Sequence, residues 1–376
     1  MTEMTPRDLT TALRKGRIDR RQALQVLASV GIGTAVLPLR ARPAAAATPN
    51  LTYYTWSGYD NPDFHPAYVE KYGGTPDYAI FGDEEEALQR IRNGYRADVA
   101  HPCTSNVVRW YDAGILKPVD VSRLKHWPDV YPAFKKINGV EIDGQTFHVP
   151  WEWGNTSIAY RPDLVDIKEE SYTLLLDQRY KGHMSVFDNS EEVPVMAALI
   201  AGIKNPFDMT DAELGEVREI MKRMNDNMRF YWTDATQMEQ ALASGEIVAT
   251  TAWNDAVKTL TDQGVPVKFM NPKEGILTWV CGMVLLKDGP GDEDQAYDFI
   301  DAMLSPESGK ALTENYYYGH SNRETLKLVD PQLVKDLGLD HAEARIADPK
   351  THFFEPMPNA QREKLNAMLE EVKSGL

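Results

Sequence analysis

Residues 245–286 read GEIVATTAWNDAVKTLTDQGVPVKFMNPKEGILTWVCGMVLL, and this stretch decides the fold class. It begins with an apolar, β-branched run from Ile247 to Trp253, which predicts a buried strand. Asn254 is a suitable N-cap for a helix that runs on to Gly264, and residues 265–270 predict the next strand. A strand, a helix and a strand in succession are typical of an α/β sheet.

Two tryptophans stand at the ends of strands in this stretch. Trp253 closes the first strand, and Trp279 opens the apolar run 280–286. Ligands of open α/β sheets bind outside the carboxyl ends of the strands, where the loops begin. Trp253 is therefore predicted to lie beside a ligand, and the alternative is that both tryptophans belong to the core.

The remaining sequence alternates strand-like and helix-like segments. Strands are expected at 51–55, 77–81, 97–100, 157–160 and 182–187. Helices are expected at 64–72, 83–92, 193–201, 211–225, 236–243, 292–304, 306–315, 331–337 and 359–372. This alternation predicts an α/β fold in which mostly parallel sheets are covered by helices.

The first 47 residues have the pattern of a cleaved export signal. Basic residues precede an apolar run at 23–39, an alanine-rich segment follows, and cleavage is expected after Ala46 or Ala47. Arg20 and Arg21 resemble a twin-arginine signal, while their neighbours leave the general secretory route open. The sequence therefore predicts an exported, soluble protein of the periplasm.

The chain is acidic, with a formal net charge of −16. The first 47 residues hold eight Lys+Arg against three Asp+Glu, so the remaining 329 residues carry −21. That length predicts two domains or lobes, and that charge argues against nucleic acid and anionic lipid as partners. The sequence contains no HxxxH, HExxH or CxxC spacing and no phosphate-binding glycine motif, so neither a metal nor a cofactor is expected.

Five blocks in a fixed order resemble the periplasmic spermidine/putrescine-binding proteins of bacterial ABC importers. They are TWSGY at 55–59, ADVAHPCTSNVVRWYDAGILKPVD at 97–120, FHVPWEWGNTSIAY at 147–160, YKGHMSVFDNSEEVPVMAAL at 180–199, and the stretch quoted above. The resemblance implies a type II periplasmic-binding-protein fold, in which two lobes close over a solute in the cleft between them. Lobe one would comprise 50–152 plus 280–322 and lobe two 155–276 plus 327–376, each a mostly parallel sheet flanked by helices.

The resemblance also implies a set of residues that line the cleft. Trp56, Tyr59, Trp253 and Trp279 would form aromatic walls, and Glu192 would supply a carboxylate. Aromatic faces pack against the methylene groups of an alkylammonium and attract its charge, by about 0.5–2 kcal/mol for each well-placed ring. A carboxylate accepts its N–H groups, which offsets the cost of removing the ammonium from water.

The chain departs from this family at several of the implied positions. Asn189 and Cys281 stand where the polyamine binders have aspartates, and His320 stands where they have another aromatic residue. Cys103 and Ser105 replace a serine and a tyrosine, and all five residues are predicted to contact the ligand. A disulfide between the two cysteines would explain why both changed at neighbouring positions. The alternative is two small buried side chains.

Fewer carboxylates leave two classes of amine open. The predicted ligand is a polyamine of the putrescine and spermidine class, and the alternative is a zwitterionic amine such as γ-aminobutyrate or a betaine. Glu152, Asp60 and Asp255 are candidates to replace the lost acids.

An exported enzyme on the same scaffold is the alternative outside the receptor class. His101 and Cys103 lie close in sequence, but a catalytic pair needs an orienting third group. Tyr316 to Tyr318 resembles the tyrosine pairs of ferric-ion-binding relatives, although its position favours an aromatic cluster. The prediction is a monomeric, non-enzymatic receptor that delivers a small amine to the ABC permease of the inner membrane, where a partner hydrolyses ATP.

Overall fold

The computed structural model describes residues 49–375, and the predicted export signal in residues 1–47 lies outside them. Its main sheet has the strand order β2-β1-β3-β12-β7-β10-β8-β9, to which β4, β11, β13 and β14 add shorter pairings. The strands of this sheet are β1 Thr52–Trp56, β2 Asp77–Phe81, β3 Val99–Ala100, β4 Leu116–Lys117, β7 Val149–Tyr160, β8 Met184–Phe187, β9 Met228–Trp232, β10 Ala249–Trp253, β11 Lys268–Phe269, β12 Ile276–Leu286, β13 Gly319–His320 and β14 Thr351–Phe353. A small separate hairpin consists of β5 Glu141–Ile142 and β6 Gln145–Thr146.

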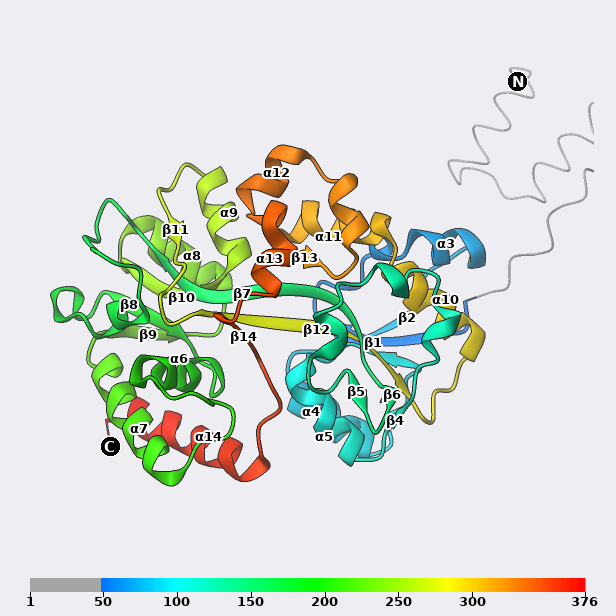
Figure 1. Cartoon of the computed structure of the whole chain (residues 1–376), viewed down its shortest axis with the longest axis horizontal. Helices are drawn as coiled ribbons and strands as arrows, with labels where there is room; N and C mark the ends of the chain where they lie inside the picture. The colour runs from blue at the N-terminus through cyan, green and yellow to red at the C-terminus, as the bar shows by residue number, and fades with distance from the viewer. Residues whose placement is uncertain (1–48, 376) are drawn as a thin grey trace, which may run out of the picture. The chain divides into compact units, whose positions relative to one another are not determined.

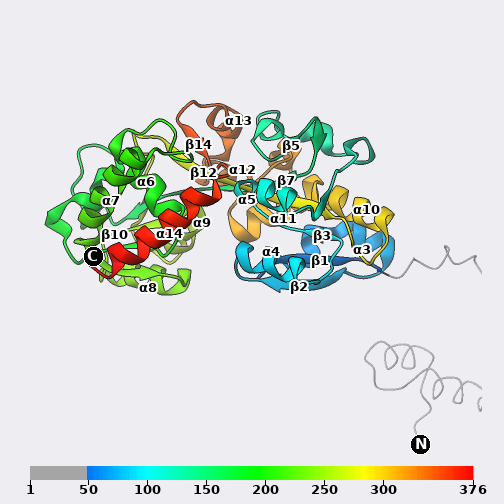
Figure 2. The same cartoon turned by 90° about the horizontal axis from the view of Figure 1, so that it is seen from below.

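Helices alternate with these strands along the chain and cover the sheet (Figure 1). They are α3 Pro66–Tyr72, α4 Glu84–Arg92, α5 Thr104–Asp112, α6 Glu192–Ala201, α7 Asp211–Asn225, α8 Ala235–Ser244, α9 Asn254–Asp262, α10 Glu293–Met303, α11 Pro306–Tyr316, α12 Pro331–Asp336, α13 Ala342–Ile346 and α14 Asn359–Lys373. Figure 2 shows α14 running along the half of the described chain that contains α6, α7 and α8. Within residues 49–375, no helix combines the length and the apolar character needed to cross a membrane.

Two long strands, β7 and β12, run through the middle of the sheet (Figure 1). They pair antiparallel from Thr156 opposite Leu277 to Val149 opposite Met283, with a register shift between Cys281 and Gly282. All 12 residues of β7 are buried, at about 3.3 Å of rise per residue. β7 is therefore long enough to contribute residues to two separate hydrophobic cores.

The outer strands pair in parallel on both sides of this central pair. β1 pairs in parallel with β2 and β3, and β8 pairs in parallel with β9 and β10. β7 pairs antiparallel with β10, β11, β12 and β13, and β12 pairs antiparallel with β3 and β4 but in parallel with β14. The predicted α/β fold with parallel sheet on each side is confirmed.

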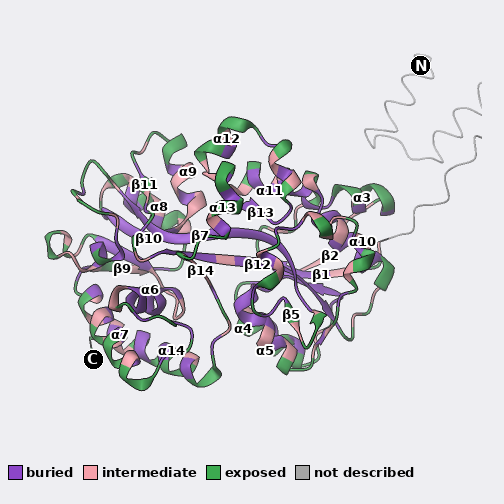
Figure 3. Ribbon diagram, in the orientation of Figure 1, coloured by how far each residue is buried: buried purple, intermediate pink, exposed green. Residues whose placement is uncertain are grey.

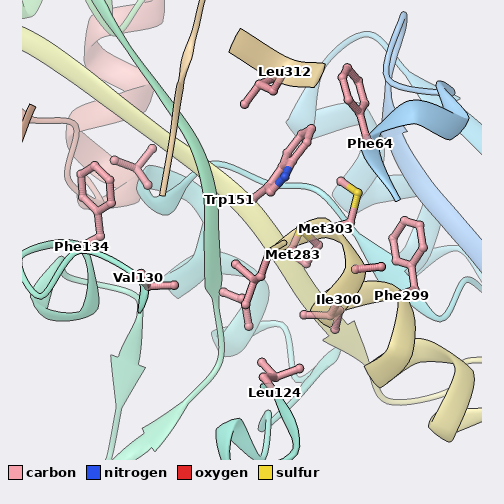
Figure 4. Close-up of a cluster of buried hydrophobic side chains, with 14 of the residues drawn as sticks. Phe64, Leu124, Val130, Phe134, Trp151, Met283, Phe299, Ile300, Met303 and Leu312 are labelled. Carbon is pink, nitrogen blue, oxygen red and sulfur yellow. The ribbon is translucent and has the colours of Figure 1, made fainter. Parts of the chain in front are cut away.

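The apolar residues form two large clusters, one at each end of β7 and β12. The first cluster contains Trp151 and Met283, and the second contains Ile158 and Leu277. Figure 4 shows the Trp151 indole in the first cluster among side chains from distant segments, including Phe64, whose ring centroid lies 5.3 Å away. In the second cluster α6 is buried on nearly every side, as Figure 3 shows.

The predicted lobe boundaries stay a prediction, and one segment packs across them. Val334, Leu339, Ala342 and Ile346 fall within the range predicted for lobe two. Their side chains pack in the first cluster, with Trp151 and Met283.

Two local predictions for the opening stretch need correction. Asn254 does not cap α9, because Trp253 occupies the cap position and the Asn254 side chain bonds elsewhere. Its Oδ1 accepts from the Asn155 N–H at 2.9 Å, and its Nδ2 donates to the Tyr317 carbonyl at 2.9 Å. The strand predicted at 265–270 is reduced to β11, which pairs with β7 only at Tyr160 and Ala159.

The two cysteines form a disulfide. Cys103 precedes α5 and Cys281 lies in β12, and the bond joins residues 178 positions apart in sequence. The hypothesis of a Cys103–Cys281 bridge is therefore supported by the structure. It ties the loop after β3 to the central strand pair.

Replacing both cysteines by alanine is expected to lower the free energy of unfolding by about 2–4 kcal/mol, because the bond closes a long loop in the unfolded state. Urea denaturation of the variant and the wild type, followed by tryptophan fluorescence, measures the difference. The denatured, unreduced wild type should contain no titratable thiol. A count of two thiols would contradict the bridge.

Candidate functional site

One face of β7 organises the candidate site. Glu152, Gly154 and Thr156 alternate along the strand, so their side-chain positions share a face. The pairing with β12 sets Cys281 opposite Glu152 and Trp279 opposite Gly154. Residues directly opposite each other in antiparallel strands lie on the same face, so five positions are brought together by register alone.

Two further strands extend this face. β10 sets Trp253 opposite Thr156, and β13 sets His320 opposite Glu152. We refer to the resulting group as the site face. Its members are Glu152, Gly154, Thr156, Trp253, Trp279, Cys281 and His320.

Glycine at position 154 is required by the tryptophan that lies over it. A Cβ there would overlap the Trp279 indole and crowd Asn254 Oδ1. The Trp279 ring meets Tyr318 edge-on at a centroid distance of 4.8 Å. Among the described residues, Trp279 Nε1 has no hydrogen-bond partner, so the indole is held by packing alone.

Glu192 lies at the Trp253 end of the site face. Its Oε1 accepts from Trp253 Nε1 at 3.2 Å and from Thr156 Oγ1 at 3.3 Å, while Oε2 has no partner within residues 49–375. The residue is only 8 % exposed, and burial raises the pKa of its carboxyl to about 7. Glu192 can therefore accept further N–H groups, and a cation beside it would lower that pKa.

Asn189 holds Glu192 in place through the backbone. Its Oδ1 accepts from the N–H groups of Glu191 and Glu192, at 2.8 and 2.9 Å. The next carboxylate, Glu191, forms an ion pair with Arg362 of α14. Asn189 thus positions the start of α6, and its predicted contact with the ligand stays a prediction.

Glu152 lies at the other end of the site face, beside Tyr59. The Tyr59 hydroxyl donates to Glu152 Oε2 at 2.8 Å, and His101 Nε2 lies 3.3 Å from Glu152 Oε1. Glu152 is 2 % exposed. The Tyr59 ring packs against Trp151 and Tyr316 at centroid distances of 5.8 and 5.3 Å, so rings from distant segments surround this carboxylate.

The carboxyl of Asp255 lies close to the phenol of Tyr318, which is also near Glu152. Burial, followed by the carboxylates of Asp255 and Glu152, raises the pKa of the Tyr318 phenol. Burial also raises the pKa of Asp255 to about 6 and that of Glu239 to about 7. Asp255 Oδ1 has no partner in the described part of the chain. The sequence indicates Asp255 as a candidate acid and Tyr318 as part of an aromatic cluster, but it gives no signal for Glu239, because the approach of these residues depends on the packing of α8 and α9.

The remaining predicted residues have partners within the protein. Burial lowers the pKa of His320 to about 4, and its Nε2 and Nδ1 are bonded to Met303 O at 3.0 Å and Asn322 N at 3.1 Å. Trp56 donates from Nε1 to His101 O at 2.9 Å and packs on Phe81, in a different cluster from Tyr59.

The loop before α5 is held by a buried carboxylate that sequence reasoning missed. Glu84 accepts from the Cys103 N–H at 2.6 Å and from Asn106 Nδ2 at 2.5 Å, and burial raises its pKa to about 7. Asn106 also donates to Ser105 Oγ at 3.3 Å. Cys103 therefore lies in a loop held by Glu84 and Ser105 lies in the first turn of α5, and the contact of both residues with a ligand stays a prediction.

The structure brings Tyr59, Trp253 and Trp279 against one common cluster, and packs Trp56 elsewhere. Within residues 49–375, no three His, Cys, Asp or Glu side chains are grouped as a metal site would require. The site face offers aromatic surface, and the neighbouring carboxylates of Glu192 and Asp255 each have an oxygen without a partner among the described residues. Such a combination suits an organic cation.

Comparison with known proteins identifies the family. The model of the bacterial extracellular solute-binding proteins matches residues 81–336. The chain belongs to this family.

Relatives of known name agree with this assignment. The chain is 24 % identical to the putrescine-binding periplasmic protein PotF of Escherichia coli, over 82 % of this chain and 87 % of that protein. It is 28 % identical to a putrescine/agmatine-binding protein of Pseudomonas aeruginosa, over 83 % and 87 % of the two chains. The spermidine/putrescine-binding protein PotD of Streptococcus pneumoniae has the same fold, with a TM-score of 0.75 at 20 % identity, over 87 % of this chain and 99 % of that one. The resemblance inferred from the sequence blocks is confirmed.

The Glu192 carboxyl is expected to make a contribution to the stability of the unliganded protein that falls as the pH rises from 5 to 7.5. The pKa of Glu192 is about 7 in the folded state, above the ordinary value of 4.5, so the folded protein binds this proton more tightly than the unfolded chain. The stability gained below pH 4.5 is therefore lost as the pH rises through 7. Urea denaturation at a series of pH values measures the slope.

Glu192→Gln should remove this contribution to the slope, while Asp255, Glu239 and Glu84 keep theirs and His320, whose pKa is lowered by burial, contributes a slope of the opposite sign. Glu216→Gln, on the exposed surface of α7, is the matched control and should leave the slope unchanged. An identical slope in Glu192→Gln and the wild type would show that burial does not shift this carboxyl.

Proposed function

We propose that the protein is the solute receptor of an ABC importer and binds an alkylammonium of the putrescine and spermidine class on the site face. One observation carries the proposal. The buried carboxylates of Glu192 and Asp255 each have an oxygen without a hydrogen-bond partner among the described residues, and the partly exposed indoles of Trp253 and Trp279 belong to the adjoining site face. Family membership and the names of the relatives support the same conclusion.

The Glu192 end suits one ammonium group. A charged amine loses several kcal/mol of hydration on burial unless acceptors replace the water. Glu192 Oε2 can accept one N–H, and Trp253, which donates to Glu192 Oε1, sets an aromatic surface beside it. An ammonium in turn keeps the carboxylate ionised at neutral pH, so protein and ligand stabilise each other's charge.

The other end suits a second ammonium group. Glu152 and Asp255 both lie near Tyr318, and Tyr59 donates to Glu152. From Thr156 to Glu152 the strand advances four residues, about 13 Å at 3.3 Å per residue. The Trp279 indole lies between these ends, over Gly154, where a chain of methylene groups would pack. This arrangement supports a diamine or a longer polyamine over an amine with a single charge.

These acids also account for the departures from the polyamine binders. The resemblance implies aspartates where this chain has Asn189 and Cys281, and Glu152 lies directly opposite Cys281 in the sheet. Glu152 and Asp255 would therefore restore the charge that two cationic groups require. The loss of two aspartates then changes where the carboxylates come from, and the ligand remains a polycation.

The wider role follows from the proposed ligand. The receptor would be exported to the periplasm, would enclose the amine between its two lobes, and would present it to a membrane permease whose ATPase supplies the energy. A binding role is favoured over thiol catalysis, because Cys103 Sγ is bonded to Cys281 and a nucleophilic Cys must be a free thiolate.

A thermal-shift panel at pH 8 tests the ligand class. Putrescine and spermidine are expected to stabilise the protein, by about 2.7 kcal/mol at a hundred times the dissociation constant, while butylamine and γ-aminobutyrate should have much smaller effects. Stabilisation by γ-aminobutyrate or a betaine but by neither diamine would overturn the proposed class in favour of a zwitterion receptor.

Isothermal titration then tests the two ends separately. Glu192→Gln and Glu152→Gln should each weaken putrescine binding by about tenfold to a hundredfold, as expected when a charge-assisted hydrogen bond worth about 1.5–3 kcal/mol is lost. Butylamine, with one charge, should be sensitive to only one of the two substitutions. Glu216→Gln serves again as the control. Unchanged putrescine affinity in both variants would exclude this site face as the binding site.

A further inference from the structure

A pocket lies beside the central strand β7, between α9 and the α12–α13 segment. It has a volume of about 840 Å³. Its walls include Asn155 of β7, Asn254 and Lys258 of α9, Lys335 of α12, Arg345 of α13, and Lys350. We call it the α9–α13 pocket. Figure 1 shows α9, α12 and α13 on the side of β7 away from α6 and α14.

The charges that line this pocket are unusual for so acidic a chain. Its cations are Lys258, Lys273, Lys335, Arg345 and Lys350, and its acids are Asp262, Asp336 and Asp348. The balance is positive, although the whole chain carries −16. A local cationic surface in a concave site raises the concentration of anions there, against the field of the remaining protein.

Several of these charged side chains already have partners within the protein. Lys258 forms an ion pair with Asp262, and Lys273 forms one with Glu169. The Asp348 carboxylate accepts from the Lys350 N–H at 2.8 Å. Asp336 accepts from the Gln332 side chain at 2.8 Å.

Three of these cations remain without an ion-pair contact among the described residues, although the Asp340 carboxylate acts on Arg345 from a longer distance. Within residues 49–375, no carboxylate lies within 4.0 Å of the charged nitrogens of Lys335, Arg345 or Lys350. Arg345 is half-buried, and its guanidinium donates only to neutral oxygens, to Gly338 O at 3.1 Å and to Asn155 Oδ1 at 3.3 Å. A guanidinium removed from water normally has a carboxylate or phosphate partner, because its fork of N–H groups matches two such oxygens.

We propose that the α9–α13 pocket binds a small organic or inorganic anion with at least two negative charges, held by Arg345 and by Lys335 and Lys350 at its rim. Dicarboxylates and phosphates share this chemistry. The volume exceeds the needs of inorganic phosphate alone and accommodates an anion of metabolite size.

The pocket borders the site face at Gly154, which belongs to both, and is further connected to it through β7. Arg345 bonds to Asn155, whose N–H donates to Asn254 Oδ1, and Asn254 directly follows Trp253. Thr156, the next residue of β7, donates to Glu192. An anion that draws Arg345 away from Asn155 would therefore act on the strand that carries Glu152, Gly154 and Thr156. Coupling of this kind is reciprocal, so amine binding would change anion affinity by the same factor.

Titration with inorganic phosphate and with malonate, at constant ionic strength and with no amine present, tests this site. We expect saturable binding by calorimetry, and whichever anion binds more tightly identifies the class of ligand. Arg345→Gln should weaken that binding by about tenfold or more, since a bidentate charge-assisted contact is lost. Lys335→Gln with Lys350→Gln, two exposed positions, should weaken it without disturbing the fold.

Lys204→Gln, on the exposed surface after α6, is the matched control and should leave anion binding unchanged. Binding that is absent, or equal in the wild type and both variants, would overturn the proposal. Failure of putrescine to bind would count against the proposed function alone, because the anion titration needs no amine.

Discussion

The pairing of β7 with β12 is the constraint on which the rest of the structure depends. These strands are buried along almost their whole length, so a slip of one residue would turn every side chain of the pair to the opposite face. Their register sets Trp279 over Gly154 and Cys281 opposite Glu152. The same strands enter both large apolar clusters, so the cores and the site face are aligned by one set of backbone hydrogen bonds.

Without a bound cation, the buried carboxyl groups of the candidate site lower the stability of the folded protein at neutral pH. Glu192, Asp255 and Glu239 are carboxyl groups whose pKa values are raised by burial, and two of them have an oxygen without a partner among the described residues. Burial of this kind weakens the folded state at neutral pH and is relieved by a cation. Two interactions stabilise the segment before α5, namely the Cys103–Cys281 disulfide and the hydrogen bond from the Cys103 N–H to Glu84.

Most of the fold could be predicted from periodicity and turn residues. The alternating segments matched α6, α7, α8 and the outer strands, because each has a clear apolar face or a buried run bounded by glycine or polar residues. Predictions were weaker where tertiary contacts replaced local ones. Asn254 has a side chain typical of a helix cap, but in the structure it bonds to the backbone N–H of Asn155 and the carbonyl of Tyr317. The strand predicted at 265–270 is limited to the two residues that pair with β7.

The sequence by itself determined the fold class, the family, and the aromatic and acidic residue types that the site would use. Only the tertiary structure decided which of them meet. Glu152 could not be chosen over Asp60 from sequence, because its place beside Tyr59 depends on the register of β7 past an irregularity in the pairing. The contact of His320 with a ligand stays a prediction, and only the structure shows that its two ring nitrogens bond to the Met303 carbonyl and the Asn322 N–H. Register and packing are long-range properties, and no local pattern of residues contains them.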